Sequence, residues 1–305
     1  MNVEPDPLAA QGVAVDTDAL LRLRVLVNHI PERKLAPAGM PGGMVTKRRG
    51  RGLETNDIRV FSFGDDIRHI DHNTTARSGV THVRTFHDER ERTAILIADF
   101  RPCMLWGTRR ALRSVAAAEA LALIGWRIIE SGGRVGLIAF GAGAPVHVAA
   151  RGRQRGMASV IGGMAAAHRA ALLALANAES TEDPPLDGAL EIAAGLAPTG
   201  SAVFLASGMD RPGDGFDSLA RALCRRAALT VLLVTDAFES RAPAGSYPVV
   251  TAKGVVQWAS IARKSAPAEP DPRRRRLDRL GMTTIAIDAG AEPEAMAEAL
   301  DRSDA

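Results

Sequence analysis

The fold of this chain is decided by residues 93–140, which read TAILIADFRPCMLWGTRRALRSVAAAEALALIGWRIIESGGRVGLIAF. The stretch opens with an unbroken apolar run, Thr93–Asp99, and closes with a second one, Arg134–Phe140. Between the two runs, residues that are apolar on most faces predict a long helix over Arg109–Ser131, which Gly132-Gly133 ends. Apolar strands joined through a helix are typical of a parallel sheet covered on both faces.

The same alternation continues toward the C-terminus, with further helices expected over Gln154–Ala176 and Leu186–Leu196. The additional predicted strands are Val146–Ala150, Ala202–Ala206, Leu229–Thr235 and Thr283–Ile287. We therefore expect an α/β fold: one open, mainly parallel twisted sheet with helices on both faces and right-handed crossovers. A Lys253-Gly254 turn predicts a small peripheral hairpin between Tyr247 and Ile261.

Three parts are expected along the chain. Residues 1–16 are predicted to be a disordered tail, and residues 93–305 to form the sheet domain. Residues 17–92 are predicted to be an extension with extended and β structure, packed on the edge of the sheet. This extension begins with a short helix, which Asp16 or Thr17 can cap and whose apolar positions recur at helical spacing.

The composition favours a cytoplasmic protein that does not insert into a membrane. The N-terminus is acidic and lacks the basic-then-apolar order of a signal peptide. The most apolar window, Val115–Ile129, carries Glu119 and Arg127 and is shorter than the about 20 apolar residues of a membrane span. The two cysteines, Cys103 and Cys224, imply no disulfide framework.

Basic residues raise nucleic-acid binding as an alternative. The formal charge is only +3, but basic runs occur at Lys47–Arg51 and Arg273–Arg276. Such runs more often form solvated loops or helix faces, so no nucleic-acid partner is expected. Binding that weakens steeply with salt would favour this alternative.

The densest motif lies between residues 50 and 108. Its pieces are Gly50-Arg51-Gly52-Leu53-Glu54, Asp57-Ile58-Arg59, Gly64-Asp65-Asp66-Ile67-Arg68, Ile70-Asp71, Thr75-Ala76-Arg77-Ser78-Gly79 and Glu89-Arg90-Glu91-Arg92. The similarity continues through Gly133–Leu137 and Thr235–Glu239. Together these pieces resemble the bacterial family called domain of unknown function 58, whose body is similar to a von Willebrand factor A domain. Phe63 and His72 depart from the family pattern, which usually has proline and tryptophan there.

The resemblance implies a non-enzymatic protein-interaction partner of a MoxR-type AAA+ ATPase, acting as an adaptor or assembly factor on a client complex. One subgroup of the family is associated with the maturation of methanol dehydrogenase, and that role stays an alternative. No cofactor is implied.

Charged residues in the motif form a second predicted feature. We interpret Asp65, Asp66, Arg68, Asp71 and Arg77 as a network of opposite charges that braces an extended segment. A partner-docking surface is the alternative reading of the same residues.

The loop after Asp99 is the predicted site, because ligands and partners of such sheets meet the carboxyl ends of the strands. Von Willebrand factor A domains can hold a divalent cation there with an Asp-x-Ser-x-Ser pattern, the metal-ion-dependent adhesion site. This chain instead reads Asp99-Phe100-Arg101-Pro102-Cys103, and the later loop reads Ser207-Gly208-Met209-Asp210. Both hydroxyl ligands are replaced, one of them by a cation, so we expect a degenerate site without metal.

The predicted partner-binding residues are therefore Asp99, Arg101, Cys103, Ser207 and Asp210. Arg101 either receives a partner's carboxylate or pairs internally with Asp99 or Asp210, and the sequence leaves both open. If Arg101 is a receptor, Arg101→Ala should weaken partner binding more than stability.

Three other chemistries are weighed as alternatives. A metal-dependent von Willebrand A-type binder would need an oxygen-rich site. A hydrolase would use Cys103 as its nucleophile. Zinc would need His69, His72, His82 and His87, which lack the tight paired spacing of structural sites.

Overall fold

The computed structural model describes residues 7–27, 55–62, 65, 67–86, 93–141, 143–177, 183–250, 255–261 and 271–302. The chain divides into two compact units. The larger unit comprises Met1–Ala38 and Arg92–Ala305, and the smaller unit comprises Gly39–Glu91. Each unit is described by itself.

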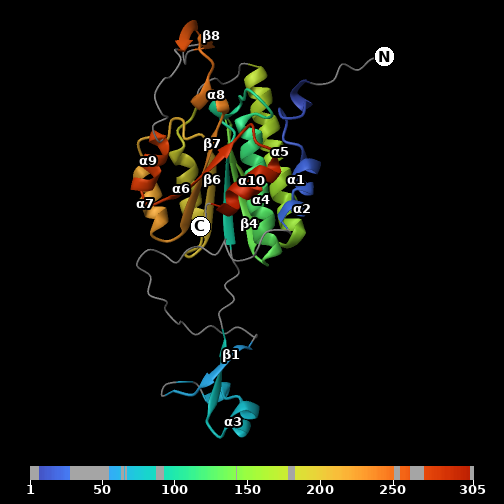
Figure 1. Cartoon of the computed structure of the whole chain (residues 1–305), viewed down its shortest axis with the longest axis vertical. Helices are drawn as coiled ribbons and strands as arrows, with labels where there is room; N and C mark the ends of the chain where they lie inside the picture. Colours follow the sequence, from blue (N-terminus) through green and yellow to red (C-terminus); the bar gives the residue numbers. More distant parts are fainter. Residues whose placement is uncertain are drawn as a thin grey trace, which may run out of the picture. The chain divides into compact units, whose positions relative to one another are not determined.

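The larger unit is built on a six-stranded sheet in the described residues, in the order β10-β7-β6-β3-β4-β5 (Figure 1). The strands are β3 (Thr93–Asp99), β4 (Arg134–Phe140), β5 (Val146–Gly152), β6 (Ala202–Ser207), β7 (Ala228–Thr235) and β10 (Thr283–Asp288). All neighbouring pairs are parallel except β4 and β5, which are antiparallel. The predicted open, mainly parallel α/β sheet is confirmed, and it is consistent with a von Willebrand factor A-like fold.

Helices cover both faces of this sheet (Figure 1). Alternate residues of β3 point to opposite faces, as the pleat requires: Leu96 joins one apolar core and Ile97 the other. The first core includes α1 (Thr17–Arg22), α2 (Arg24–Val27), α4 (Arg113–Glu130), α5 (Arg153–Ala176) and α10 (Pro293–Arg302). The second core includes α6 (Asp187–Leu196), α7 (Phe216–Cys224) and α9 (Pro272–Arg279).

Helix α4 begins at Arg113, four residues later than the predicted Arg109. A 3-10 turn at Pro102–Met104 and an irregular loop occupy the residues before it. The backbone N–H groups of this loop bond to distant residues instead of to a preceding helical turn. The N–H of Thr108 donates to Asp236, and that of Leu112 donates to the Gly12 carbonyl. Tertiary partners therefore override the helical pattern.

The N-terminal segment differs from the expected disordered tail. Residues 7–16 pack on the larger unit, with a 3-10 helix at Pro7–Ala9 and a buried Val15. The Leu112 N–H donates to the Gly12 carbonyl at 2.8 Å. Gly12 has φ +78°, and a Cβ there would overlap the Arg110 carbonyl, so this approach requires glycine. Residues 1–6 lie outside the described part.

Helices α1 and α2 also belong to the larger unit rather than to the extension with which the sequence analysis grouped them. Trp126 of α4 donates its indole N–H to the Leu20 carbonyl at 2.9 Å, and α2 contacts α4. The apolar positions of this helical stretch therefore pack into the first core.

The smaller unit contains the predicted β structure. Strands β1 (Thr55–Val60) and β2 (His82–Phe86) pair antiparallel, and α3 (His72–Ser78) lies between them in the sequence. Asp71 caps α3 and Gly79 ends it with φ 72°. The predicted packing of this region on the sheet edge stays a prediction.

The predicted peripheral hairpin is present. Strands β8 (Gly245–Val250) and β9 (Val256–Ile261) pair antiparallel, and they follow the short helix α8 (Ala237–Arg241). The Lys253-Gly254 turn itself lies outside the described residues. Phe238 and Tyr247 meet edge to face, with ring centroids 5.1 Å apart.

Among the described residues, one helix is long and apolar enough to cross a membrane, namely α5. It packs on β4 and β5 and contributes Met157, Val160 and Met164 to the first core. The apolar window that drew attention in the sequence, Val115–Ile129, lies instead in the buried helix α4.

Candidate functional site

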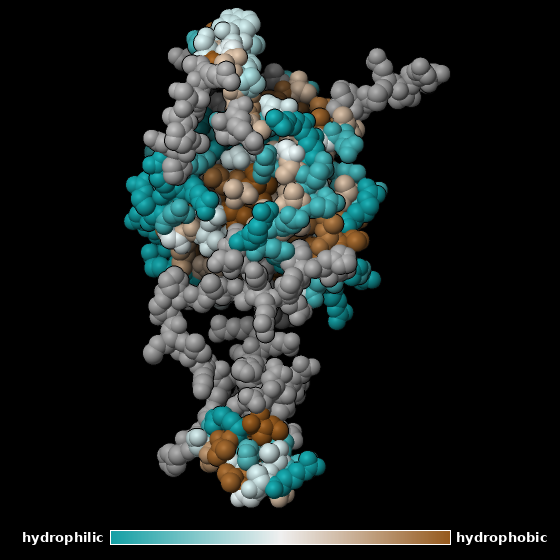
Figure 2. Space-filling model, viewed as in Figure 1, coloured by the Kyte–Doolittle hydropathy of each residue, from teal (hydrophilic) through white to brown (hydrophobic). Residues whose placement is uncertain are grey.

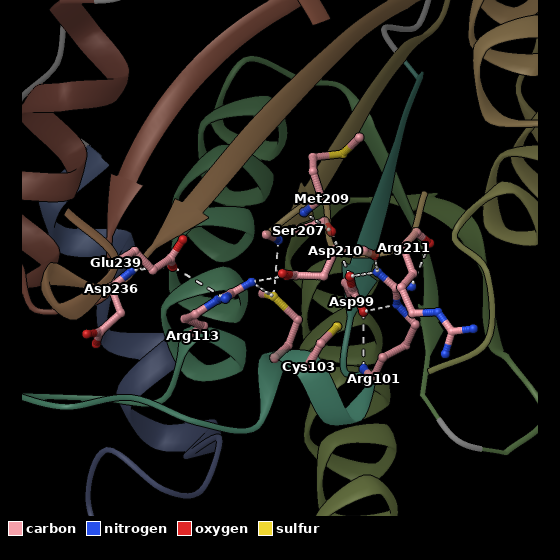
Figure 3. Close-up of polar contacts among 12 residues, drawn as sticks. Asp99, Arg101, Cys103, Arg113, Ser207, Met209, Asp210, Arg211, Asp236 and Glu239 are labelled. Carbon is pink, nitrogen blue, oxygen red and sulfur yellow. Dashed lines mark hydrogen bonds and ion pairs between the residues drawn. The ribbon is translucent and has the colours of Figure 1, made fainter. Parts of the chain in front are cut away.

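The loops that follow β3, β6 and β7 meet at the carboxyl-terminal end of the parallel strands, and we call this end of the sheet the rim (Figure 3). It brings together Asp99 at the end of β3, Ser207 at the end of β6, and Asp236 after β7. The five predicted partner-binding residues all lie at the last position of β3 or β6 or in the loops that follow these strands, as expected for the carboxyl ends of parallel strands.

Arg101 pairs internally with Asp99. Its Nε donates to Asp99 Oδ1 at 2.9 Å and its Nη2 to Asp99 Oδ2 at 2.8 Å, a forked ion pair with both side chains 0% exposed. Ser207 adds a third side-chain bond by donating its hydroxyl to Asp99 Oδ2 at 2.7 Å. Both carboxylate oxygens are thus occupied by protein donors.

The rest of the Arg101 guanidinium binds backbone carbonyls. Nη1 donates to Pro184 at 2.7 Å and to Arg211 at 3.2 Å, and Nη2 donates to Asp210 at 2.7 Å. All five N–H groups of the guanidinium are therefore used. Burial acts to lower the pKa of Arg101, but the bonds to Asp99 outweigh this effect. The pKa of Arg101 therefore lies above its ordinary value.

Of the two alternatives that the sequence leaves open for Arg101, this geometry supports internal pairing with Asp99 over reception of a partner's carboxylate. A guanidinium that is fully buried and has no spare donor cannot accept a new anion without breaking its present bonds. Arg101 instead ties together the loop after β3, the segment before α6 and the loop after β6.

A second chain of alternating charges crosses the rim (Figure 3). Arg113, at the start of α4 and 2% exposed, binds the Asp210 carboxylate and lies 3.3 Å from Glu239. Glu239 in turn pairs with Arg273 at 2.8 Å, and Arg273 pairs with Asp271. The start of α4, the loop after β6, α8 and the start of α9 are thereby connected through charge-assisted bonds.

The loop after β6 has a strained backbone that suits this arrangement. Met209 and Arg211 have positive φ values of 60° and 45°, which non-glycine residues rarely adopt. A Cβ at Gly208 would overlap Arg113 Nη2. Only glycine at 208 lets the guanidinium of Arg113 lie against the loop.

The Thr235–Glu239 motif contains the N-terminal cap of helix α8, which Asp236 and Glu239 form. Its side chain accepts the backbone N–H of Phe238, while Glu239 accepts the N–H of Asp236, which forms a capping box at the start of α8. Asp236 also binds the hydroxyl and N–H of Thr108. Burial acts to raise the pKa of Asp236, but these bonds outweigh it and lower the pKa.

Cys103 is half-buried near several carboxylates, and its backbone N–H donates to Asp183 at 2.9 Å. Burial and, after it, the charge of Asp99 raise the pKa of the Cys103 thiol. Because the thiolate is the nucleophile, this environment disfavours the hydrolase alternative.

A buried hydrogen-bonded pair behind the rim, His168 and Ser114, was not predicted from the sequence. His168 of α5 is 1% exposed, and its Nε2 lies 2.8 Å from Ser114 Oγ in the first turn of α4. Its ring meets Phe100 edge to face at 5.0 Å. Burial lowers the pKa of His168 to about 4, so the ring is neutral at pH 7.

In the smaller unit, two residues of the predicted charged network have local structural roles. Asp65 pairs with Arg59 at 2.7 Å and accepts the Ser62 N–H, and Asp71 accepts the Thr74 N–H as a helix cap. Arg68 lies in a 3-10 turn and Arg77 at the end of α3, whereas Asp66 lies outside the described residues. The choice between a brace and a docking surface stays a prediction.

The basic run Arg273–Arg276 is partly neutralised. Arg273 pairs with Asp271 and Glu239, and Arg276 pairs with Asp217 at 2.7 Å. Hydrophilic residues dominate the surface over α7 and α9 (Figure 2). These pairs fit a solvated helix face better than a nucleic-acid surface. The other run, Lys47–Arg51, lies outside the described residues.

The histidines weighed as a zinc alternative lie only partly within the described residues. Within the described ranges, no group of three or more His, Cys, Asp or Glu side chains is placed to hold a metal ion. His82 instead bonds Ser78 and the Val80 carbonyl. His87 lies outside those ranges.

Fold and site together define a class of protein: an open α/β sheet whose strand-end loops are joined by buried ion pairs. The family model described as "Protein of unknown function DUF58" matches residues 57–264, more than half of the chain. The chain belongs to this family.

Curated relatives match over a shorter stretch. The uncharacterized proteins Mb1516 of Mycobacterium bovis and Rv1480 and MT1527 of Mycobacterium tuberculosis are each 33% identical over 106 residues. The match covers 34% of this chain and 33% of each relative, so the chain spans about a third of their length.

Proposed function

We propose that this chain is a non-catalytic protein-interaction module, an adaptor or assembly factor that works in the cytoplasm with a MoxR-type AAA+ ATPase on a client complex. The observation that carries the proposal is the rim, where the side chains suited to chemistry are already engaged. Asp99 accepts bonds from Arg101 and Ser207, and the thiol of Cys103 has a raised pKa. A rim held rigid in this way favours docking of a preformed surface.

The resemblance to von Willebrand factor A domains supports the same proposal, because it implies binding at this end of the sheet. The partner would contact the more exposed rim groups rather than Arg101. These include the half-exposed Trp106, the carboxylate of Asp210 with 36% of its side chain exposed, and the exposed Arg211. Asp99, Arg101 and Ser207 would support them from beneath.

Affinity purification of the tagged chain from its native host, with and without ATP, tests the proposal. We expect a AAA+ ATPase among the retained proteins under at least one condition. Its absence from both would contradict the adaptor role.

A matched pair of variants tests the surface. Arg211→Glu reverses an exposed charge at the rim, whereas Arg225→Glu reverses one at the C-terminal end of α7, beside the opposite end of the sheet. We expect the first to reduce ATPase recovery about tenfold and the second to leave it unchanged, because a reversed charge at an interface opposes association. Equal recovery of the ATPase with both variants would show that the docking surface does not lie at the rim.

A further inference from the structure

A pocket of about 270 Å³ lies between the N-terminal segment and α5, within the larger unit. Leu8 and Val15 of the segment face Ala165 and Leu172 of the helix across it. This volume is just below the about 300 Å³ at which small-molecule sites usually begin. The volume therefore limits any occupant to a small molecule and is too small for a partner's helix or strand.

His168 supplies a polar group in the pocket wall. Its Nε2 is engaged by Ser114, and its Nδ1 makes no hydrogen bond with the described residues. In the tautomer whose Nε2 accepts the Ser114 hydroxyl, the proton is on Nδ1, and this N–H can donate to a ligand.

Arg169 supplies the charge. It is exposed, it lines the same pocket, and it forms no ion pair with any residue that the structure describes. The lining contains no acidic side chain. The electrostatic potential in the pocket thus favours a negatively charged group on the ligand.

We propose that this pocket binds a small carboxylic acid with an unbranched apolar tail. The carboxylate pairs with Arg169 and accepts the Nδ1–H of His168, while the tail packs against Leu8, Val15 and Leu172. None of the lining residues belongs to the rim loops, so the proposal does not depend on the function proposed for them.

Calorimetric titration of the full chain with hexanoate, and with hexan-1-ol as the uncharged probe of the same length, tests the proposal. We expect saturable binding of hexanoate at millimolar or lower concentration and binding of hexan-1-ol at least about fivefold weaker. Arg169→Gln should weaken hexanoate binding about fivefold, as expected for a partly exposed ion pair. Ala165→Phe should abolish it by filling the pocket.

Arg155→Gln is the matched control, because Arg155 is an exposed arginine of the same helix that does not line the pocket. It should leave hexanoate binding unchanged, and circular dichroism should show that all three variants are folded. The proposal is overturned if hexanoate does not bind saturably, if hexan-1-ol binds equally well, or if a folded Ala165→Phe variant still binds hexanoate.

Discussion

Arg101 shows how burial decides between two roles that one side chain can have. The resemblance to von Willebrand factor A domains implies that it stands where those domains can carry a metal-binding hydroxyl, and a solvent-facing arginine there would be a receptor for acidic groups. In the structure it is 0% exposed and bonded to Asp99 and three backbone carbonyls. Its guanidinium group therefore holds three segments of the chain together.

We expect Arg101→Ala to lower the free energy of unfolding by about 3–5 kcal/mol, because it leaves the Asp99 carboxylate buried without its partner. This reverses the order expected for a receptor, in which binding would suffer more than stability. Urea denaturation followed by circular dichroism measures the change. Arg109→Ala, an exposed neighbour in the next loop, should change stability by less than about 0.5 kcal/mol. Equal stability of the two variants would contradict the structural role of Arg101.

At the scale of elements, the strand-end loops depend on one another. The loop after β6 accepts bonds from Arg101 of the loop after β3, from Arg113 of α4 and from Arg273 of α9. Its positive φ values at Met209 and Arg211 are maintained by these partners. A change in one loop should therefore disturb its neighbours.

Gly208→Ala tests this dependence. The added methyl group would displace the Arg113 guanidinium, so we expect a loss of about 3 kcal/mol from overpacking and a broken ion pair. Gly188→Ala is the matched control, because a Cβ there meets open space in the first turn of α6. It should be neutral or stabilise by up to about 1 kcal/mol. Thermal denaturation compares the two, and a stable Gly208→Ala variant would show that the loops adjust independently.

At the scale of the whole molecule, the chain forms two compact units of unequal size. Both apolar core clusters consist of residues from the larger unit, among the residues that the structure describes. In its described residues, the smaller unit contributes a two-stranded sheet, a 3-10 turn and one short α-helix, which is little structure for independent stability.

We expect the larger unit to fold without the smaller one. Replacing residues 39–91 by a flexible Gly/Ser linker should leave a cooperative unfolding transition and the helical circular dichroism of the sheet domain, because both cores are retained. The full chain is the control. A deletion variant that is unfolded or lacks a cooperative transition would show that the smaller unit is needed for the fold.

The sequence by itself determined the strands, most helices, the parallel sheet and the end of the sheet at which the candidate site lies. These features follow from local patterns, since an apolar run or a helical period is visible within a few adjacent residues. The capping roles of Asp71 and Asp236 are also local. The motif between residues 50 and 108 further pointed to the family that the comparison identifies.

Only the tertiary structure decided what the charged residues do. The partners of Arg101 include carbonyls 83 to 110 residues away in the sequence, and His168 meets Ser114 across 54 residues. The ordered segment at residues 7–16 likewise depends on the distant Leu112 N–H. Whether a charge binds a partner or stays buried depends on which groups surround it in space, and neighbours along the chain do not carry that information.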